Sequence, residues 1–280
     1  MRRFLTIILC VLGTLTLVAG EEGEEKEKKK KKNWSNNTEL STVSTAGNSE
    51  ANSFGLINKY AYVLGKGTFT WNVFAIEVET TTTTTVTATG TEEAPVFIED
   101  KNSMVSSENY RSVLEYKRDF AKRTSWFAGL YWEQDEPQGF SDRSKVAGGV
   151  ANTWFKSDKR LFSTNYGIGF NEESLTTGLE EEFVTAELGY VLMLQFGNAQ
   201  FDQKMESSIS KEDSDDWRVR LENGLTISIL ENLALKLSVI LKYNNQPNVI
   251  QVPLADTDIM VGYELENLDT QITTSLVIRF

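Results

Sequence analysis

Apolar and polar residues alternate along most of the chain, and this period of two is the feature that most limits its fold. Between Val184 and Leu194 every second residue is apolar or aromatic, and the residues between them include Thr185, Glu187 and Gly189. The same alternation recurs near residues 217–229 and 233–243. A helix would repeat its apolar residues every three or four positions, so the pattern predicts strands with one apolar and one polar face.

The alternation divides the chain into about twelve expected strands, with a range of about ten to fourteen. Most are longer than the ~5–6 residues of globular strands and suit a tilted crossing of a ~25 Å apolar layer. We therefore expect an all-β fold, a transmembrane antiparallel β-barrel of outer-membrane type. The expected strands are residues 34–46, 52–64, 68–82, 103–117, 124–134, 144–156, 160–171, 182–196, 199–210, 215–229, 232–244 and 269–280.

The connections between these strands alternate between short and long. Outer-membrane barrels have short periplasmic turns and longer external loops, so the alternation supports a barrel with both ends on the periplasmic side. The short connections are residues 65–67, 118–123, 157–159, 197–198 and 230–231, and the mostly long ones are 83–102, 135–143, 171–181, 211–214 and 245–268.

The last expected strand ends on an aromatic residue. Leu276, Ile278 and Phe280 share one face of it, and Arg279 lies on the other. This ending resembles the carboxyl-terminal signal that the bacterial outer-membrane assembly machinery recognises. We expect that machinery, outer-membrane lipid and lipopolysaccharide to be partners of the chain, and the barrel to be a monomer.

The first residues have the pattern of an export signal. Arginines precede an apolar run that ends at Val18, and small residues follow up to Gly20. We expect residues 1–20 to be a signal peptide. Residues 21–33 are then a charged, disordered periplasmic linker, because they contain almost nothing apolar, and residues 34–280 form the barrel. The expected location is the outer membrane of a Gram-negative bacterium.

The chain contains no histidine and one cysteine, Cys10, which falls in the expected signal peptide. Histidine-based catalytic triads and histidine metal ligands are therefore excluded. We expect no enzymatic activity, no catalytic residue, no metal and no cofactor. A histidine-free enzyme that pairs Glu115 with Glu187 or Glu222 is a disfavoured alternative, because nothing in the sequence brings these carboxylates together.

The formal net charge of −12 argues against a nucleic-acid partner, which would require a basic face. Acidic residues gather in the expected long loops, among them Asp135, Glu172, Glu173 and Asp213. Clustered carboxylates can capture divalent cations, but no loop has the spacing of a calcium loop. Simple solvation of the loops is the favoured interpretation.

If the apolar rows face lipid, the alternate rows face the interior and bring charged residues together. A barrel of about twelve strands lies between the filled interiors of ~8 strands and the open porins of ~16–18. Two interpretations stay open: a pore lining that sets ion selectivity, and, slightly favoured, a ladder of ion pairs that fills a narrow interior. The expected interior residues are Lys59, Arg111, Glu115, Lys117, Glu187, Lys204, Glu206, Arg218, Arg220, Glu222, Lys236, Lys242 and Arg279.

Several short motifs carry a family resemblance. They are Gly47-Asn48-Ser49, the stretch 110–143, the glycine pair Gly148-Gly149, the stretch 243–247, and Asp269-Thr270 leading into the last strand. In these motifs the chain resembles the family of salt-induced outer-membrane proteins, domain of unknown function 481. The charged tract before Trp34 and the Thr-rich stretch 80–102 depart from the family. The resemblance implies an outer-membrane barrel without a defined activity, and it supplies no catalytic residue.

Three hypotheses on function follow. The favoured one is a non-enzymatic outer-membrane barrel, serving as a narrow channel or as a structural component of the envelope under salt stress. The second is a soluble exported barrel that binds an apolar ligand, with the row of Leu188 and Leu192 facing inward. The third is the histidine-free enzyme.

Overall fold

The structure of the chain is a computed structural model. It describes residues 33–46, 51–79, 83–103, 106–255 and 259–280. The predicted signal peptide, and all but the last residue of the predicted linker, lie outside the described residues. Within the described ranges there is no helix with the length and apolar character needed to span a membrane.

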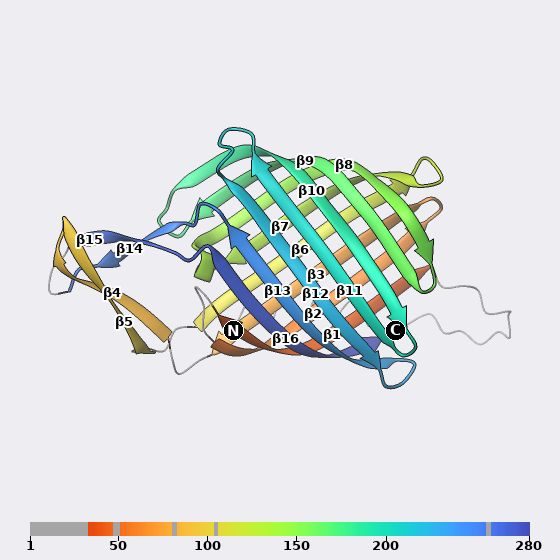
Figure 1. The fold of residues 1–280 in the computed structure, drawn as a ribbon, viewed down its shortest axis with the longest axis horizontal. Coiled ribbons are helices and arrows are strands. Elements are labelled where there is room, and N and C mark those ends of the chain that lie inside the picture. The colour runs from red at the N-terminus through yellow and green to blue at the C-terminus, as the bar shows by residue number, and fades with distance from the viewer. Residues whose placement is uncertain (1–32, 47–50, 80–82, 104–105, 256–258) are drawn as a thin grey trace, which may run out of the picture.

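Twelve antiparallel strands of the described chain close into a barrel (Figure 1). The first and last strands, β1 and β16, pair from Asn37 opposite Arg279 to Ala46 opposite Thr270 and so close the ring. This confirms the predicted all-β barrel and its strand number. The barrel strands are β1 (Trp34–Ala46), β2 (Ala51–Leu64), β3 (Gly67–Glu79), β6 (Ser106–Asp119), β7 (Thr124–Asp135), β8 (Phe140–Ser157), β9 (Arg160–Leu175), β10 (Glu180–Phe196), β11 (Ala199–Ser210), β12 (Trp217–Ser228), β13 (Leu233–Asn244) and β16 (Leu268–Arg279).

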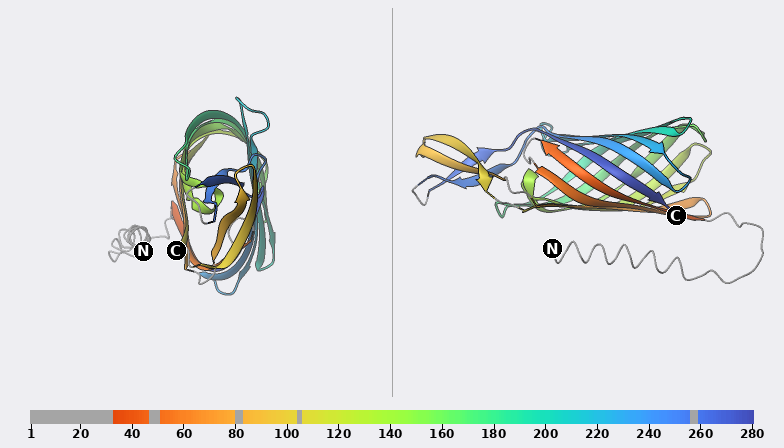
Figure 2. Two further views of the ribbon diagram at one scale, coloured as in Figure 1. Left: turned by 90° about the vertical axis from the view of Figure 1, so that its left-hand side faces the viewer. Right: turned by 90° about the horizontal axis from the view of Figure 1, so that it is seen from below.

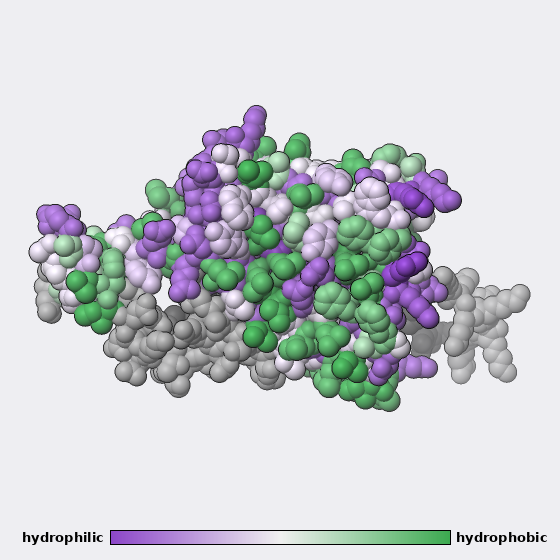
Figure 3. Space-filling model, in the orientation of Figure 1, coloured by the Kyte–Doolittle hydropathy of each residue, from purple (hydrophilic) through white to green (hydrophobic). Residues whose placement is uncertain are grey.

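The apolar rows of the strands form the outer wall of the barrel. On β9, Tyr166, Ile168 and Phe170 are all exposed, whereas the alternate residue Asn171 is buried. On the face drawn in Figure 3, apolar side chains gather over the middle of the wall and hydrophilic ones lie toward both of its ends. Leu188 is also exposed on the outside. This orientation is opposite to the one that the apolar-ligand hypothesis requires.

The two ends of the barrel differ in the length of their connections. At one end the turns are short, and Gly65 and Gly197 each open a two-residue turn with φ of 62° and 60°. Hairpin turns of this length need a left-handed backbone, which glycine adopts without steric cost. β1 begins and β16 ends at the same end, where the Arg279 N–H donates to the carbonyl of Asn232 in a short turn.

Two long connections contain strands that the sequence pattern did not predict. β4 (Thr83–Thr91) pairs with β5 (Ala94–Ser103), and β14 (Val249–Pro253) pairs with β15 (Met260–Glu264). Both hairpins project beyond the barrel at its long-loop end (Figure 2). They join through a parallel bridge between Ala88 and Leu254. The prediction of plain loops here was wrong: β4 is rich in β-branched threonines, which favour an extended backbone, and the two hairpins share a small apolar core of Ala88, Val252, Leu254 and Val261.

Aromatic side chains cluster near both ends of the outer wall. Toward the short turns, the Tyr116 ring lies 4.5 Å from that of Phe69 and 5.3 Å from that of Trp126, measured between ring centres. Toward the long loops, Trp217 stacks on Tyr243 at 4.9 Å. Aromatic girdles of this kind mark the two interfaces of membrane barrels, because their rings combine apolar and polar character.

We expect Ile168→Arg to destabilise the barrel in lipid vesicles by about 2–4 kcal/mol, the cost of a basic side chain at the middle of a lipid-facing strand. The measurement is equilibrium unfolding by guanidinium in the presence of vesicles. Leu179→Arg is the control, since Leu179 is exposed in the loop between β9 and β10. Equal stabilities of the two variants would contradict the outward, lipid-facing placement of Ile168.

Candidate functional site: a charged barrel interior

The interior of the barrel contains two cavities. The cavity nearer the long loops has a volume of about 130 Å³, and the one nearer the short turns has a volume of about 400 Å³. Arg111 on β6 and Arg220 on β12 line both of them. β6 and β12 lie on opposite sides of the ring of strands. The two arginines therefore face the interior from opposite walls, at the level where the cavities adjoin.

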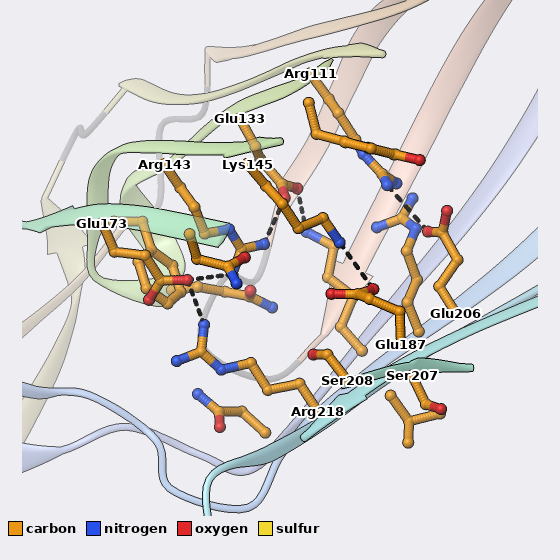
Figure 4. A pocket seen from close by; sticks show the side chains of 18 of the residues that line it. Arg111, Glu133, Arg143, Lys145, Glu173, Glu187, Glu206, Ser207, Ser208 and Arg218 are labelled. Carbon is orange, nitrogen blue, oxygen red and sulfur yellow. Dashed lines mark hydrogen bonds and ion pairs between the residues drawn. The ribbon is translucent and has the colours of Figure 1, made fainter. Parts of the chain in front are cut away.

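Around the smaller cavity, carboxylates contact basic side chains from adjacent and from more distant strands (Figure 4). Glu173 contacts Arg218 at 2.6 Å and Arg143 at 3.7 Å. Arg143 in turn contacts Glu133 at 2.5 Å. Its guanidinium also lies 4.5 Å from the ring centre of the buried Phe140. These contacts connect β7, β8, β9 and β12 on the inner side of the wall.

Two further sets of ion pairs cross the interior. Lys242 on β13 contacts Glu133 at 3.8 Å and also pairs with Asp135, although β13 and β7 lie on opposite sides of the ring. Arg111 on β6 reaches Glu206 on β11 at 3.0 Å. Because these side chains must extend across the lumen to meet, they narrow it.

The larger cavity is lined by a second group of charges. Glu39 on β1 contacts Lys59 at 3.2 Å and Lys236 at 3.3 Å. Lys204 and Arg111, which also line this cavity, both contact Glu206 of the smaller cavity, at 2.7 Å and 3.0 Å. One carboxylate offsets one positive charge. Where two basic side chains share a single carboxylate, the group of three therefore keeps a net charge of about +1.

This sharing recurs through the interior. Glu39, Glu133, Glu173 and Glu206 each contact two basic side chains. Around the smaller cavity the sharing is mutual, since Arg143, Arg218 and Lys242 each contact two carboxylates. The larger cavity is lined by six basic and three acidic residues, and the smaller one by six and four. The interior is thus basic, although the whole chain carries a net charge of −12.

The structure places most of the predicted interior residues at these cavities. Glu115 and Lys117 lie on the inner face of β6 but line neither cavity; Glu115 accepts a hydrogen bond of 3.4 Å from the Tyr131 hydroxyl. The predicted residues that line a cavity are Lys59, Arg111, Glu187, Lys204, Glu206, Arg218, Arg220, Glu222, Lys236, Lys242 and Arg279. The residues of the predicted assembly signal are on the outer row of β16, with Leu276 and Phe280 exposed and Ile278 half-buried.

Sequence reasoning missed several interior charges, namely Glu39, Glu133, Arg143, Lys145 and Glu173. The alternation itself could have found Glu133. Trp132 belongs to the outward row of β7, so the next residue, Glu133, must point into the interior. Arg143 and Glu173 were missed because strands β8 and β9 extend further into the predicted loops than the sequence pattern indicates.

The acidic residues predicted for the long loops fall into two groups. Asp135 and Glu173 are buried in the interior, so their assignment to solvated loops was wrong. Asp213 does lie in a loop, where the Asp215 N–H and the Gln246 side chain donate to its carboxylate and lower its pKa. Among the described residues, no group of three or more acidic or cysteine side chains is arranged to hold a metal ion.

The long-loop mouth of the barrel is crossed by the short segment between β7 and β8. Its 3-10 turn η1 (Glu136–Gln138) ends at Gly139, which has a left-handed φ of 83°. The Gln138 side chain donates to Asp269 on β16 at 2.6 Å, and the Asn248 side chain donates to the Gln138 carbonyl at 2.8 Å. Since β8 and β16 lie on opposite sides of the ring, these bonds hold the segment across the mouth.

The closed sheet, apolar wall and charged interior define a β-barrel of outer-membrane type. The chain belongs to the family described as protein of unknown function, DUF481, whose family model matches residues 38–280. This confirms the resemblance seen in the sequence motifs. A comparison with curated proteins gives no match.

Solved structures with a similar fold include porins. A NanC porin is 7% identical, with 86% of this chain and 98% of that chain covered and a TM-score of 0.48. A KdgM porin is 8% identical, with coverage of 87% and 99% and a TM-score of 0.44. At these identities and scores the likenesses define neither a solute nor a mechanism.

We expect Glu39→Gln to destabilise the barrel by about 3–5 kcal/mol, because it leaves the buried Lys236 without its carboxylate partner. The side chains of Glu39 and Lys236 are 4% and 8% exposed, so water offsets little of this loss. Guanidinium unfolding in vesicles measures the effect. Glu172→Gln is the control, since Glu172 is exposed; a Glu39 variant as stable as this control would show that the shared ion pair is not stabilising.

Proposed function

We propose that this protein is a narrow, anion-favouring channel in the outer membrane of a Gram-negative bacterium. The observation that carries the proposal is the basic interior of an acidic chain: both cavities are lined by more basic than acidic side chains. Fixed charges that line a narrow pore set the sign of the ions it favours, because the apolar wall screens them less than water would.

The placement in a membrane is supported by the outer wall. It combines exposed apolar rows with aromatic clusters near both ends of the strands. The closed ring leaves no unpaired strand edge, which is a requirement for crossing a layer without water. Outer-membrane lipid and lipopolysaccharide are the proposed surroundings of this wall, the assembly machinery is the proposed partner during insertion, and the proposed state is a monomer.

The proposed solutes are small, because the interior is divided. Ion pairs from Lys242 to β7 and from Arg111 to β11 cross the lumen, and the η1 segment crosses its long-loop mouth. The proposed channel requires these contacts to exchange partners when an ion passes, so that they narrow the path without sealing it. The channel is proposed to act without chemistry, as a passive path.

The proposal predicts an anion preference in planar bilayers. With a tenfold gradient of KCl across the membrane, the zero-current potential of the purified protein should shift toward the equilibrium potential of chloride. Arg220→Glu should reduce this shift or reverse its sign, because it replaces a basic residue that lines both cavities by an acidic one. Lys122→Glu, on an exposed short turn, is the control and should leave the shift unchanged.

Two results would contradict the proposal. A cation preference of the unaltered protein would show that the interior charge does not set selectivity. The lack of any step conductance from a correctly folded protein would show that the ion pairs close the lumen, as in the alternative of a filled structural barrel.

A further inference from the structure

The larger cavity has the dimensions and the charge of a binding site, and this inference rests on the proposed channel function and deepens it. Its volume of about 400 Å³ falls within the ~300–1,000 Å³ of small-molecule sites. Its charged lining comes from β1, β2, β6, β11, β12, β13 and β16, and all of these except β1 supply a basic residue.

On one side of this cavity, two lysines share one carboxylate. Lys59 and Lys236 both contact Glu39, which is 3% exposed. Glu39 offsets one of the two positive charges, and the other is left facing the cavity. The side chain of Lys59 is 38% exposed and is therefore accessible from the lumen.

On the adjoining side, Arg220 supplies a positive charge that no carboxylate holds. Among the described residues, no acidic oxygen lies within 4.0 Å of its guanidinium, although Glu222 lines the larger cavity and Glu206 lines the smaller one. The Arg220 side chain is half-buried, and its guanidinium faces the cavity without a carboxylate of the described chain in contact. An anion that entered the cavity would supply the acceptor.

We propose that the larger cavity binds a compact anion with two or more negative charges, carried by carboxylate or phosphate groups. Lys59, Lys236 and Arg220 are the groups that hold it, with Lys204 beside them. Glu222 and Asp202 line the same cavity and oppose the anion. Their repulsion keeps binding weak enough for release, which a site within a conducting path requires.

Calorimetric titration of the purified barrel in detergent tests this site without any need for conduction. The probes are citrate, inorganic phosphate and gluconate, the last a carboxylate with a single charge. Citrate or phosphate should bind with a saturable heat, and gluconate should bind at least about tenfold more weakly, since it forms fewer charge-assisted hydrogen bonds. Saturation by citrate alone assigns the site to polycarboxylates, and saturation by phosphate alone assigns it to phosphate groups.

Two variants should change the affinity in opposite directions, and a third serves as the control. Lys59→Gln should weaken binding of the favoured probe by about tenfold, because it removes a charged donor while Glu39 keeps Lys236 as its partner. Glu222→Gln should strengthen binding, since it removes an opposing charge that has no ion-pair partner within 4.0 Å among the described residues. Lys145→Gln is the matched control: it removes one lumenal charge, but at the smaller cavity only, and should leave binding unchanged.

The outcomes separate this proposal from the channel function. No saturable heat with either citrate or phosphate would overturn the site, even if the bilayer experiment shows an anion preference. Equal weakening by Lys59→Gln and Lys145→Gln would also overturn it, because general lumen charge would then explain the binding. Saturable binding with the expected variant effects, in a barrel that conducts no current, would support the site and contradict the channel.

Discussion

Closure of the sheet between β1 and β16 is the constraint on which the rest of the structure depends. The ten residue pairs from Asn37–Arg279 to Ala46–Thr270 give the first and last strands a partner on both sides. Without them the barrel would have two open edges, whose backbone groups cost several kcal/mol each in an apolar layer. Closure also separates the two faces of every strand, so that the apolar row faces outward and the charged row faces a shared interior.

The charged side chains enclosed by the barrel determine how the interior is paired and which sign of charge it presents to a solute. Removed from bulk water, they must be paired, and the structure pairs them by placing Glu39, Glu133, Glu173 and Glu206 each between two cations. The basic excess is largest at the larger cavity, which six basic and three acidic residues line. The acidic excess of the chain lies elsewhere, in part on the outer loops, as at Asp213. Net charge taken over the whole sequence therefore has the opposite sign to the charge that a solute in the lumen would meet.

The barrel could be predicted from the sequence because each strand carries its own pattern. Alternation is local, so it gave the strand number and the inner face that holds Arg220 and Glu222 without knowledge of the neighbours. The pairing of charges could not be predicted in this way. Lys242 meets Asp135 across the ring, and that contact depends on the shear and cross-section of the closed barrel. The hairpins β4–β5 and β14–β15 were missed because their small core forms only when both are present, around Ala88 and neighbouring residues.

Cross-linking of β1 to β16 tests ring closure most directly. Ser41 and Ser275 are opposite each other, both are buried, and their hydroxyls have no hydrogen-bond partner, so cysteine at both positions should cost little. In a Cys10→Ser background, Ser41→Cys with Ser275→Cys should form a disulfide within one chain on mild oxidation, because facing residues of paired strands lie within the ~4.4–6.8 Å that a disulfide spans. Ser41→Cys with Ser238→Cys, separated by β16, should not. Disulfides only between different chains, or equal yields from the two pairs, would contradict the closed barrel.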